Sequence, residues 1–201
     1  MEAAVPIHAA ATLVIWRAGP SGPQVLMGQR GAAAVFMPSK YVFPGGRVDA
    51  GDAGDLALLS ALCLHRLSLH PLHQAPGIPA LIGAALRELT EETGLSLRPS
   101  PETLRFIFRA ITPPGRSRRF DARFFLVSAD HLAEAHDDFT AASGELGHLH
   151  WIGLTEAPAL DLPFITEVVL AEVAALLRGT DQPGVPFFDN SGATPQFRRL
   201  G

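Results

Sequence analysis

The segment from Pro79 to Gly94 constrains the fold more than any other part of the sequence, because its ends and its long faces are both specified. Proline is favoured in the first turn of a helix and glycine just after its end, so we expect a helix over about residues 80–93. Apolar residues at helical spacing form one edge of this helix. A second edge carries three carboxylates, those of Glu88, Glu91 and Glu92. Such a helix must lie against a core with its acidic edge at the margin.

Strand patterns occur on both sides of this helix. The expected strands cover residues 7–17, 24–30, a segment that ends at Phe43, 103–112, 118–129 and 148–154. Two further helices are expected over residues 56–69 and 163–178. The segment 180–201 is expected to be an extended tail that packs on the body. The alternation of strand pairs and separate helices predicts an α/β fold, with helices covering a mixed sheet, in one domain over residues 1–201.

Composition argues against several classes of function. The net charge of -4 is unfavourable for a general nucleic-acid-binding protein. Cys63 is the only cysteine, so neither an intramolecular disulfide nor a cysteine metal cluster can form. The apolar run near the N-terminus is too short for a membrane span and no basic segment precedes it. We therefore expect a cytoplasmic protein with neither nucleic acid nor membrane as a partner.

The three carboxylates on one helix edge suggest a metal site. At this spacing they lie within about 5–6 Å of one another and repel unless cations lie between them. Hard oxygen ligands suit Mg²⁺ or Mn²⁺, which complete their coordination with water and substrate phosphates. Arg87 lies one turn before Glu91 and can orient or partly neutralise the group. Taken alone, the helix leaves open an ordinary solvated acidic face.

A second stretch, residues 41–52, reads as a strand followed by Pro44 and two glycines. Gly45 and Gly46 indicate a sharp turn, or a group that approaches the backbone too closely for a side chain. Asp52 adds an acid at the end of the stretch.

The two stretches together resemble the Nudix box, in which a glycine and a downstream acid precede Arg-Glu-aliphatic-x-Glu-Glu-x-Gly-aliphatic. Gly46 and Asp52 supply the first half, and residues 87–95 fill every specified position of the second. The acid is Asp where the family has Glu, and an insertion at residues 53–79 separates the halves. Surface insertions cost little loop-closure entropy, so the halves can still meet.

The split box resembles one branch of the Nudix hydrolase superfamily, related to the mammalian peroxisomal coenzyme A diphosphatase. The runs VFMPSKYVFPGGRVDAGD and ITPPGRSRRFDARFF look like signatures of that branch. The resemblance implies a Nudix-type α/β/α sandwich with a mixed sheet and a helical insertion inside the box. It also implies a homodimer as one possible assembly, because Nudix proteins are frequently dimers.

The same resemblance implies a metal-dependent hydrolase. Its substrate would be a nucleoside diphosphate linked to another moiety X, cleaved to two monophosphates. Coenzyme A or an acyl-CoA is favoured by the branch, and ADP-ribose, NADH and nucleoside triphosphates are alternatives. A Nudix-like module that senses a nucleotide without cleaving it is an alternative of another class.

Roles for individual residues also follow from the resemblance. The residues that would hold Mg²⁺ or Mn²⁺ are Gly46, Glu88, Glu91 and Glu92. A diphosphate would approach the backbone at Gly45, and Arg87 and Glu91 would take part in catalysis. Glu145, in a glycine-flanked loop ahead of Trp151, occupies the place from which family members often supply a general base.

Arginines near the strand over residues 118–129 form a further candidate group. The planar guanidinium suits phosphate oxygens, so we expect some of these arginines to bind the substrate. The residues expected to do so are Arg116, Arg119 and Arg123. Alternation along a strand places Arg119 and Arg123 on one face. Simple surface solubility is the alternative.

Overall fold

The computed structural model describes residues 5–69 and 77–201. The strands are β1 (Ile7–Gly19), β2 (Gly22–Arg30), β3 (Tyr41–Val42), β4 (Gly45–Arg47), β5 (Arg105–Ile111), β6 (Arg119–Ser128), β7 (Leu146–Gly153), β8 (Val185–Asp189) and β9 (Gln196–Leu200). The helices are α1 (Ala61–Ser68), α2 (Ile78–Thr93) and α3 (Phe164–Leu177), with short 3₁₀ turns η1 (Leu56–Leu58), η2 (Ala129–His131) and η3 (Ala157–Ala159). Within the described ranges, no helix is both long and apolar enough to cross a membrane.

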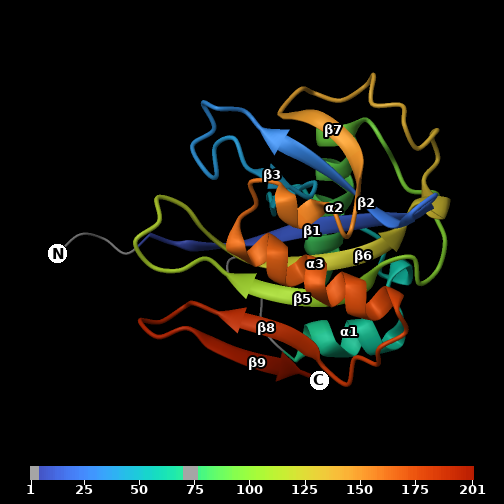
Figure 1. Cartoon of the computed structure of the whole chain (residues 1–201). Helices are drawn as coiled ribbons and strands as arrows, with labels where there is room; N and C mark the ends of the chain where they lie inside the picture. The colour runs from blue at the N-terminus through green and yellow to red at the C-terminus, as the bar shows by residue number, and fades with distance from the viewer. Residues whose placement is uncertain (1–4, 70–76) are drawn as a thin grey trace.

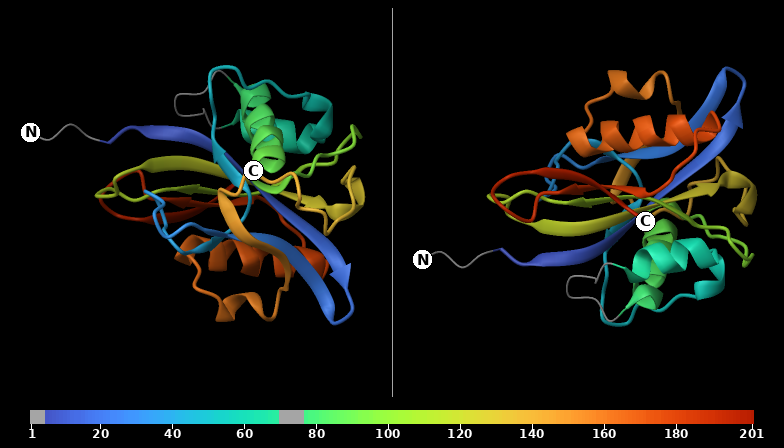
Figure 2. Two further views of the ribbon diagram at one scale, coloured as in Figure 1. Left: turned by 90° about the horizontal axis from the view of Figure 1, so that it is seen from above. Right: turned by 90° about the horizontal axis from the view of Figure 1, so that it is seen from below.

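The strands form one mixed sheet in the order β3-β2-β1-β6-β5-β8-β9, with β4 paired to β1 and β7 paired to β2. The central pair, β1 and β6, is parallel, and so is the pair β5 and β8. Helices α1 and α2 cover one face of the sheet and α3 covers the other (Figures 1 and 2). The predicted α/β/α sandwich with a mixed sheet is therefore confirmed.

Alternation along β1 separates the two halves of the core. Leu13 and Ile15 pack in the cluster on the α2 side, whereas Val14 packs in the cluster that includes the apolar residues of α3. All three side chains are fully buried. The strand is apolar on both faces because helices cover both faces of the sheet.

Helix α2 follows its sequence signals closely. It begins at Ile78 with Pro79 in its first turn, and Gly94 ends it in the left-handed conformation at φ 75°. The predicted apolar edge is buried at Ile82, Ala85 and Leu89. The capping residues and the apolar edge thus place the acidic edge beside the sheet.

The insertion forms η1 and α1 in place of the single helix expected over residues 56–69. The break is at Ser60, whose side chain accepts a hydrogen bond from the Cys63 N–H and so starts a new helix. The backbone N–H of Leu104 donates to the Leu58 carbonyl at 2.8 Å, which fastens the insertion beside β5. Residues 70–76 of the insertion lie outside the described residues.

The C-terminal segment corrects the expectation of an extended tail. Residues after Gly179 form the β8–β9 hairpin, and β8 joins the sheet beside β5. Val185 and Phe187 alternate into the core on the α2 side. The hairpin therefore extends the sheet and contributes to the core of the molecule.

Two glycines let the start of the insertion cross α2. A Cβ on Gly83 would lie 2.3 Å from the backbone nitrogen of Ala53, and a Cβ on Gly54 would lie 2.7 Å from the nitrogen of Gly83. The Gly54 N–H also donates to the Pro79 carbonyl at 2.8 Å. Backbone thus packs directly on backbone at this crossing.

We predict that Gly83→Ala destabilises the protein, although alanine favours a helix by about 1 kcal/mol over glycine. Because the atoms that meet the new methyl group belong to the backbone, we expect a net loss of about 1–3 kcal/mol in the free energy of unfolding. Urea denaturation measures this loss. Gly51→Ala is the matched control, because a Cβ there has no atom within 4 Å. Equal losses in the two variants would contradict the close crossing.

Candidate active site

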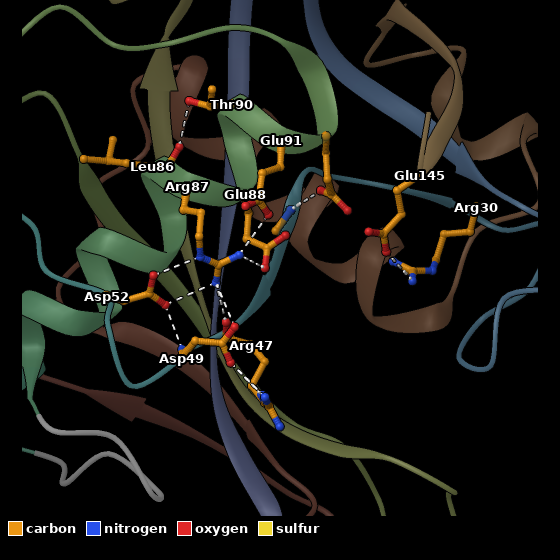
Figure 3. A network of polar contacts seen from close by, with 12 residues as sticks. Arg30, Arg47, Asp49, Asp52, Leu86, Arg87, Glu88, Thr90, Glu91 and Glu145 are labelled. Carbon is orange, nitrogen blue, oxygen red and sulfur yellow. Dashed lines mark hydrogen bonds and ion pairs between the residues drawn. The ribbon is translucent and has the colours of Figure 1, made fainter. Parts of the chain in front are cut away.

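The two halves of the box meet between β4 and α2, and Arg87 joins them (Figure 3). Arg87 donates from Nε to Asp52 Oδ1 at 2.9 Å and from Nη2 to Asp52 Oδ2 at 3.1 Å. This two-point contact uses the planar fork of the guanidinium. The aspartate, although shorter than the family glutamate, thus reaches the arginine across the insertion.

The same guanidinium also orients the acidic edge. Its Nη1 lies 2.8 Å from Glu88 Oε1 and 3.1 Å from Glu91 Oε2, and Nη2 donates to the Arg47 carbonyl at 3.0 Å. The hydrogen bond to Asp52 raises the pKa of Arg87 further than burial lowers it. Burial alone would raise the pKa of Asp52, but hydrogen bonds from Arg87 and from the Asp49 N–H hold it below its usual value. Both groups therefore remain charged.

The glycines of β4 accommodate the acids of α2. A Cβ on Gly46 would lie 2.1 Å from Glu88 Oε1, so any side chain there would displace the carboxylate. Gly45 has φ 154°, and a Cβ on it would lie 2.4 Å from the Ala11 carbonyl. Its N–H donates to Glu92 Oε2 at 2.7 Å. In this structure, the groups that approach the glycines are the Glu88 and Glu92 carboxylates and the backbone of β1.

The three carboxylates of the acidic edge differ in depth. Glu92 is 2% exposed, the Glu88 side chain is 13% exposed and the Glu91 side chain is 56% exposed. Burial raises the pKa of Glu92 to about 8 against the opposing hydrogen bond from Gly45, and the charges of Glu88 and Glu145 add to the effect. Burial also raises the pKa of Glu88 despite its contact with Arg87. Negative charge is thus costly at the two deeper positions.

These donors fit a hard divalent cation. No salt bridge involves Glu92 in the parts of the chain that the structure describes, so a bound cation would compensate its charge. Within those parts, no three His, Cys, Asp or Glu side chains are already arranged as a complete metal site. Mg²⁺ needs no such arrangement, because it usually takes one or two carboxylates and completes its shell with water and substrate phosphates. Glu88, Glu92 and the Gly46 carbonyl are the groups that would hold it.

Glu145 lies next to this group, just before β7. Its Oε1 accepts a hydrogen bond from Arg30 Nη2 at 3.1 Å, and its side chain is 57% exposed. Its charge contributes to the raised pKa of both Glu88 and Glu92, so the three carboxylates share one electrostatic environment. The loop thus brings Glu145 toward the acids of α2, and its catalytic role stays a prediction.

Two of the arginines expected to bind phosphate lie in the interior of the protein. Arg123 is 1% exposed and its Nη1 lies 2.7 Å from Asp121 Oδ2. Arg119 is also buried and donates to the carbonyls of Thr112 and Asn190 at 3.0 and 2.9 Å. The two side chains share one strand face, as expected, but that face is interior. Substrate binding by Arg119 and Arg123 therefore does not fit the structure.

The turn before β6 holds the exposed arginines. Arg116 is exposed, and its expected contact with substrate stays a prediction. Arg118, two residues further on, is exposed and lines a cavity together with Arg30 and Glu145. Arg30 is not among the candidates that the sequence suggests, because an arginine at a strand end carries no spacing signal of its own.

Comparison with known proteins shows what this chain is similar to. Residues 76–173 match the model of the NUDIX domain. Over these residues the chain is similar to the Nudix domain. The match begins after most of the insertion, so the first half of the Nudix box lies outside it. In the structure, Asp52 of that first half contacts Arg87 of the second half.

Solved structures show the same Nudix fold. A Nudix hydrolase from Alicyclobacillus acidocaldarius superposes with a TM-score of 0.60 at 27% identity, covering 86% of this chain and 93% of its own. The MutT Nudix hydrolase from Burkholderia pseudomallei superposes with a TM-score of 0.54 at 17% identity, covering 83% of this chain and 97% of its own. The Nudix domain of Shewanella oneidensis NrtR, complexed with ADP-ribose, superposes with a TM-score of 0.52 at 13% identity, covering 88% of this chain and 90% of its own. None of the curated proteins compared matches the sequence.

The match over residues 76–173 and the likeness to the Nudix hydrolase from Alicyclobacillus acidocaldarius support a hydrolase of the pyrophosphatase type. Nudix hydrolases generally use divalent metals such as Mg²⁺ or Mn²⁺, which agrees with the oxygen donors of Glu88 and Glu92.

We predict that Glu92→Gln stabilises the metal-free protein at high pH. The pKa of Glu92 is 4.5 in the unfolded reference and about 8 in the folded protein, so folding stability falls as the pH rises from 4.5 to about 8. The amide removes this titration. The Tm of the variant should therefore match that of the wild type near pH 5 and exceed it by roughly 4 °C or more at pH 8.

Thermal unfolding in EDTA measures this difference. Saturating Mg²⁺ at pH 8 should then raise the Tm of the wild type and leave that of Glu92→Gln nearly unchanged. A Tm difference that does not depend on pH would contradict the assignment of a desolvated carboxylate at this position.

Proposed function

We propose that this Nudix hydrolase is a Mg²⁺- or Mn²⁺-dependent diphosphatase that cleaves a nucleoside diphosphate linked to a moiety X into two monophosphates. One observation carries the proposal: the buried Glu92 and the half-buried Glu88 lie against the glycine backbone of β4, where a bound cation would offset their charge. The favoured substrates are coenzyme A and acyl-CoA. ADP-ribose and NADH are the alternatives.

The residues of the site have separable tasks. Glu88, Glu92 and the Gly46 carbonyl would hold the metal, with Glu91 assisting from its exposed position. A metal held there would supply positive charge that neutralises the diphosphate and lowers the pKa of bound water. Arg87 holds Glu88 and Glu91 in place through its bonds at 2.8 and 3.1 Å, and the diphosphate would approach along Gly45.

Glu145 is the proposed proton acceptor. In hydrolysis, the oxygen of water forms a bond to phosphorus, the bond from that phosphorus to the bridging oxygen breaks, and the bridging oxygen leaves with the other phosphate. The proton of the water needs a base within hydrogen-bonding reach. Glu145 approaches the acids from the loop before β7 and is partly exposed, so it can contact a substrate that enters the site.

Two observations bear on the choice of substrate. The split Nudix box resembles the branch related to coenzyme A diphosphatase, which favours a coenzyme A derivative. The Nudix domain of Shewanella oneidensis NrtR has ADP-ribose bound, which keeps ADP-ribose among the candidates for this fold. A homodimer and a cytoplasmic location remain predictions.

The decisive experiment measures turnover of coenzyme A, an acyl-CoA, ADP-ribose and NADH with Mg²⁺ by chromatographic separation of products. We expect two monophosphate products from at least one substrate, and a kcat lowered about 100-fold or more in Glu88→Gln and in Glu92→Gln. Glu167→Gln, an exposed carboxylate on α3 across the sheet, is the control and should keep the wild-type rate. If the wild-type protein hydrolysed none of the four substrates, a nucleotide-sensing module would be favoured.

A second kinetic prediction concerns the base. Glu145→Gln should lower kcat while KM stays unchanged or decreases, because the lost interaction is made mainly in the transition state. Steady-state kinetics at saturating substrate provide the measurement. A wild-type kcat in Glu145→Gln would show that Glu145 is not the general base.

A further inference from the structure

A cavity of about 370 Å³ lies beside the acidic site and is not used by the groups that would hold the metal. Its walls include Arg30, residues 33–36, Arg118 and Glu145. The residues come from the end of β2, the loop that follows it, the turn before β6 and the loop before β7. A volume of this size lies in the range of small-ligand sites.

Arg30, which lines the cavity, has one donor that is not satisfied. Its Nη2 donates to Glu145 Oε1 at 3.1 Å, but its buried Nε has no hydrogen-bond partner among the described residues. A buried N–H of a cation without an acceptor is costly, and a phosphate oxygen is a suitable acceptor. Arg30 also acts electrostatically on Glu92, so it lies near the acidic site. Figure 3 shows its guanidinium directed at Glu145.

Arg118 supplies a second guanidinium to the cavity from another element. Together Arg30 and Arg118 bring two positive charges, and Glu145 brings one negative charge. The cavity lining therefore keeps a net positive charge, in contrast to the acids of α2 next to it. A ligand with negative charge at one end matches this lining.

The apolar side of the cavity is held in shape. The Arg30 N–H donates to the Lys40 carbonyl at 2.9 Å and the Ser39 N–H donates to the Arg30 carbonyl at 3.1 Å, which closes the base of the loop. Phe36 packs edge-on against Phe120, with ring centroids 5.2 Å apart. The loop wall is thus positioned by the fold before any ligand binds.

We infer that this cavity binds the part of the substrate beyond the phosphate nearest Glu88 and Glu92. Arg30 and Arg118 hold oxygens of the second phosphate, and residues 33–36 contact the organic group attached to it. Since that phosphate competes with Glu145 for Arg30, substrate binding frees the Glu145 carboxylate beside the acidic site. The inference rests on the proposed diphosphatase function and names its substrate-binding residues.

The test uses inorganic pyrophosphate as a probe of the cavity. Isothermal titration calorimetry of the full chain in EDTA measures its affinity without metal or turnover. Arg30→Gln and Arg118→Gln should each weaken binding about 10-fold or more, because each removes charged hydrogen bonds to phosphate. Arg30→Lys keeps the positive charge. It should still weaken binding, because an ammonium cannot donate two parallel hydrogen bonds to phosphate oxygens as a planar guanidinium does.

Two further variants make the expected pattern specific. Arg178→Gln removes an exposed arginine at the end of α3, which does not line the cavity, and should change the affinity less than about twofold. Glu145→Gln removes the competitor for Arg30 and should tighten binding several-fold. Circular dichroism confirms that each variant is folded.

Several results would overturn the inference: no pyrophosphate binding by the wild type, wild-type affinity in both Arg30→Gln and Arg118→Gln, or equal weakening in Arg178→Gln. The outcome is separable from that of the diphosphatase proposal. Pyrophosphate binding with the expected pattern but no turnover would sink only the proposed function. Turnover with a wild-type KM in both arginine variants would sink only the assignment of this cavity.

Discussion

The contact between Arg87 and Asp52 is the interaction on which the site depends. It joins two segments that the insertion separates, and the same guanidinium contacts Glu88 and Glu91. A lysine could not replace it, because one ammonium cannot present a planar set of donors to several carboxylates. This contact therefore holds Asp52, just before the insertion, and orients the Glu88 carboxylate beside Gly46.

Local chemistry made α2 and its acidic edge predictable from the sequence. Pro79 and Gly94 act within their own helix turns, and the apolar edge follows from the helical period, so no distant residue is needed to predict them. The glycines of β4 are an intermediate case. They predicted a close approach to the backbone, but only the tertiary structure shows that the Glu88 carboxylate makes that approach at Gly46.

The features that sequence reasoning missed depend on contacts between distant segments. Strand alternation correctly placed Arg119 and Arg123 on one face, but it could not tell which face the rest of the chain covers. The β8–β9 hairpin joins the sheet by pairing with β5, and no local pattern specifies that partner. Arg30 became a candidate only through its contact with Glu145 and the cavity they share.

The parallel pairing of β1 with β6 has a consequence for the order of folding. The register joins Ile7 to Arg119 and Trp16 to Ser128, so β1 cannot find this neighbour until more than half of the chain has been synthesised. Contacts so distant in sequence close slowly, because the entropy of a long loop must be lost first. Helix α2 needs only local contacts and can form earlier. On the ribosome, the acidic edge would therefore exist as a helix face before the centre of the sheet is complete.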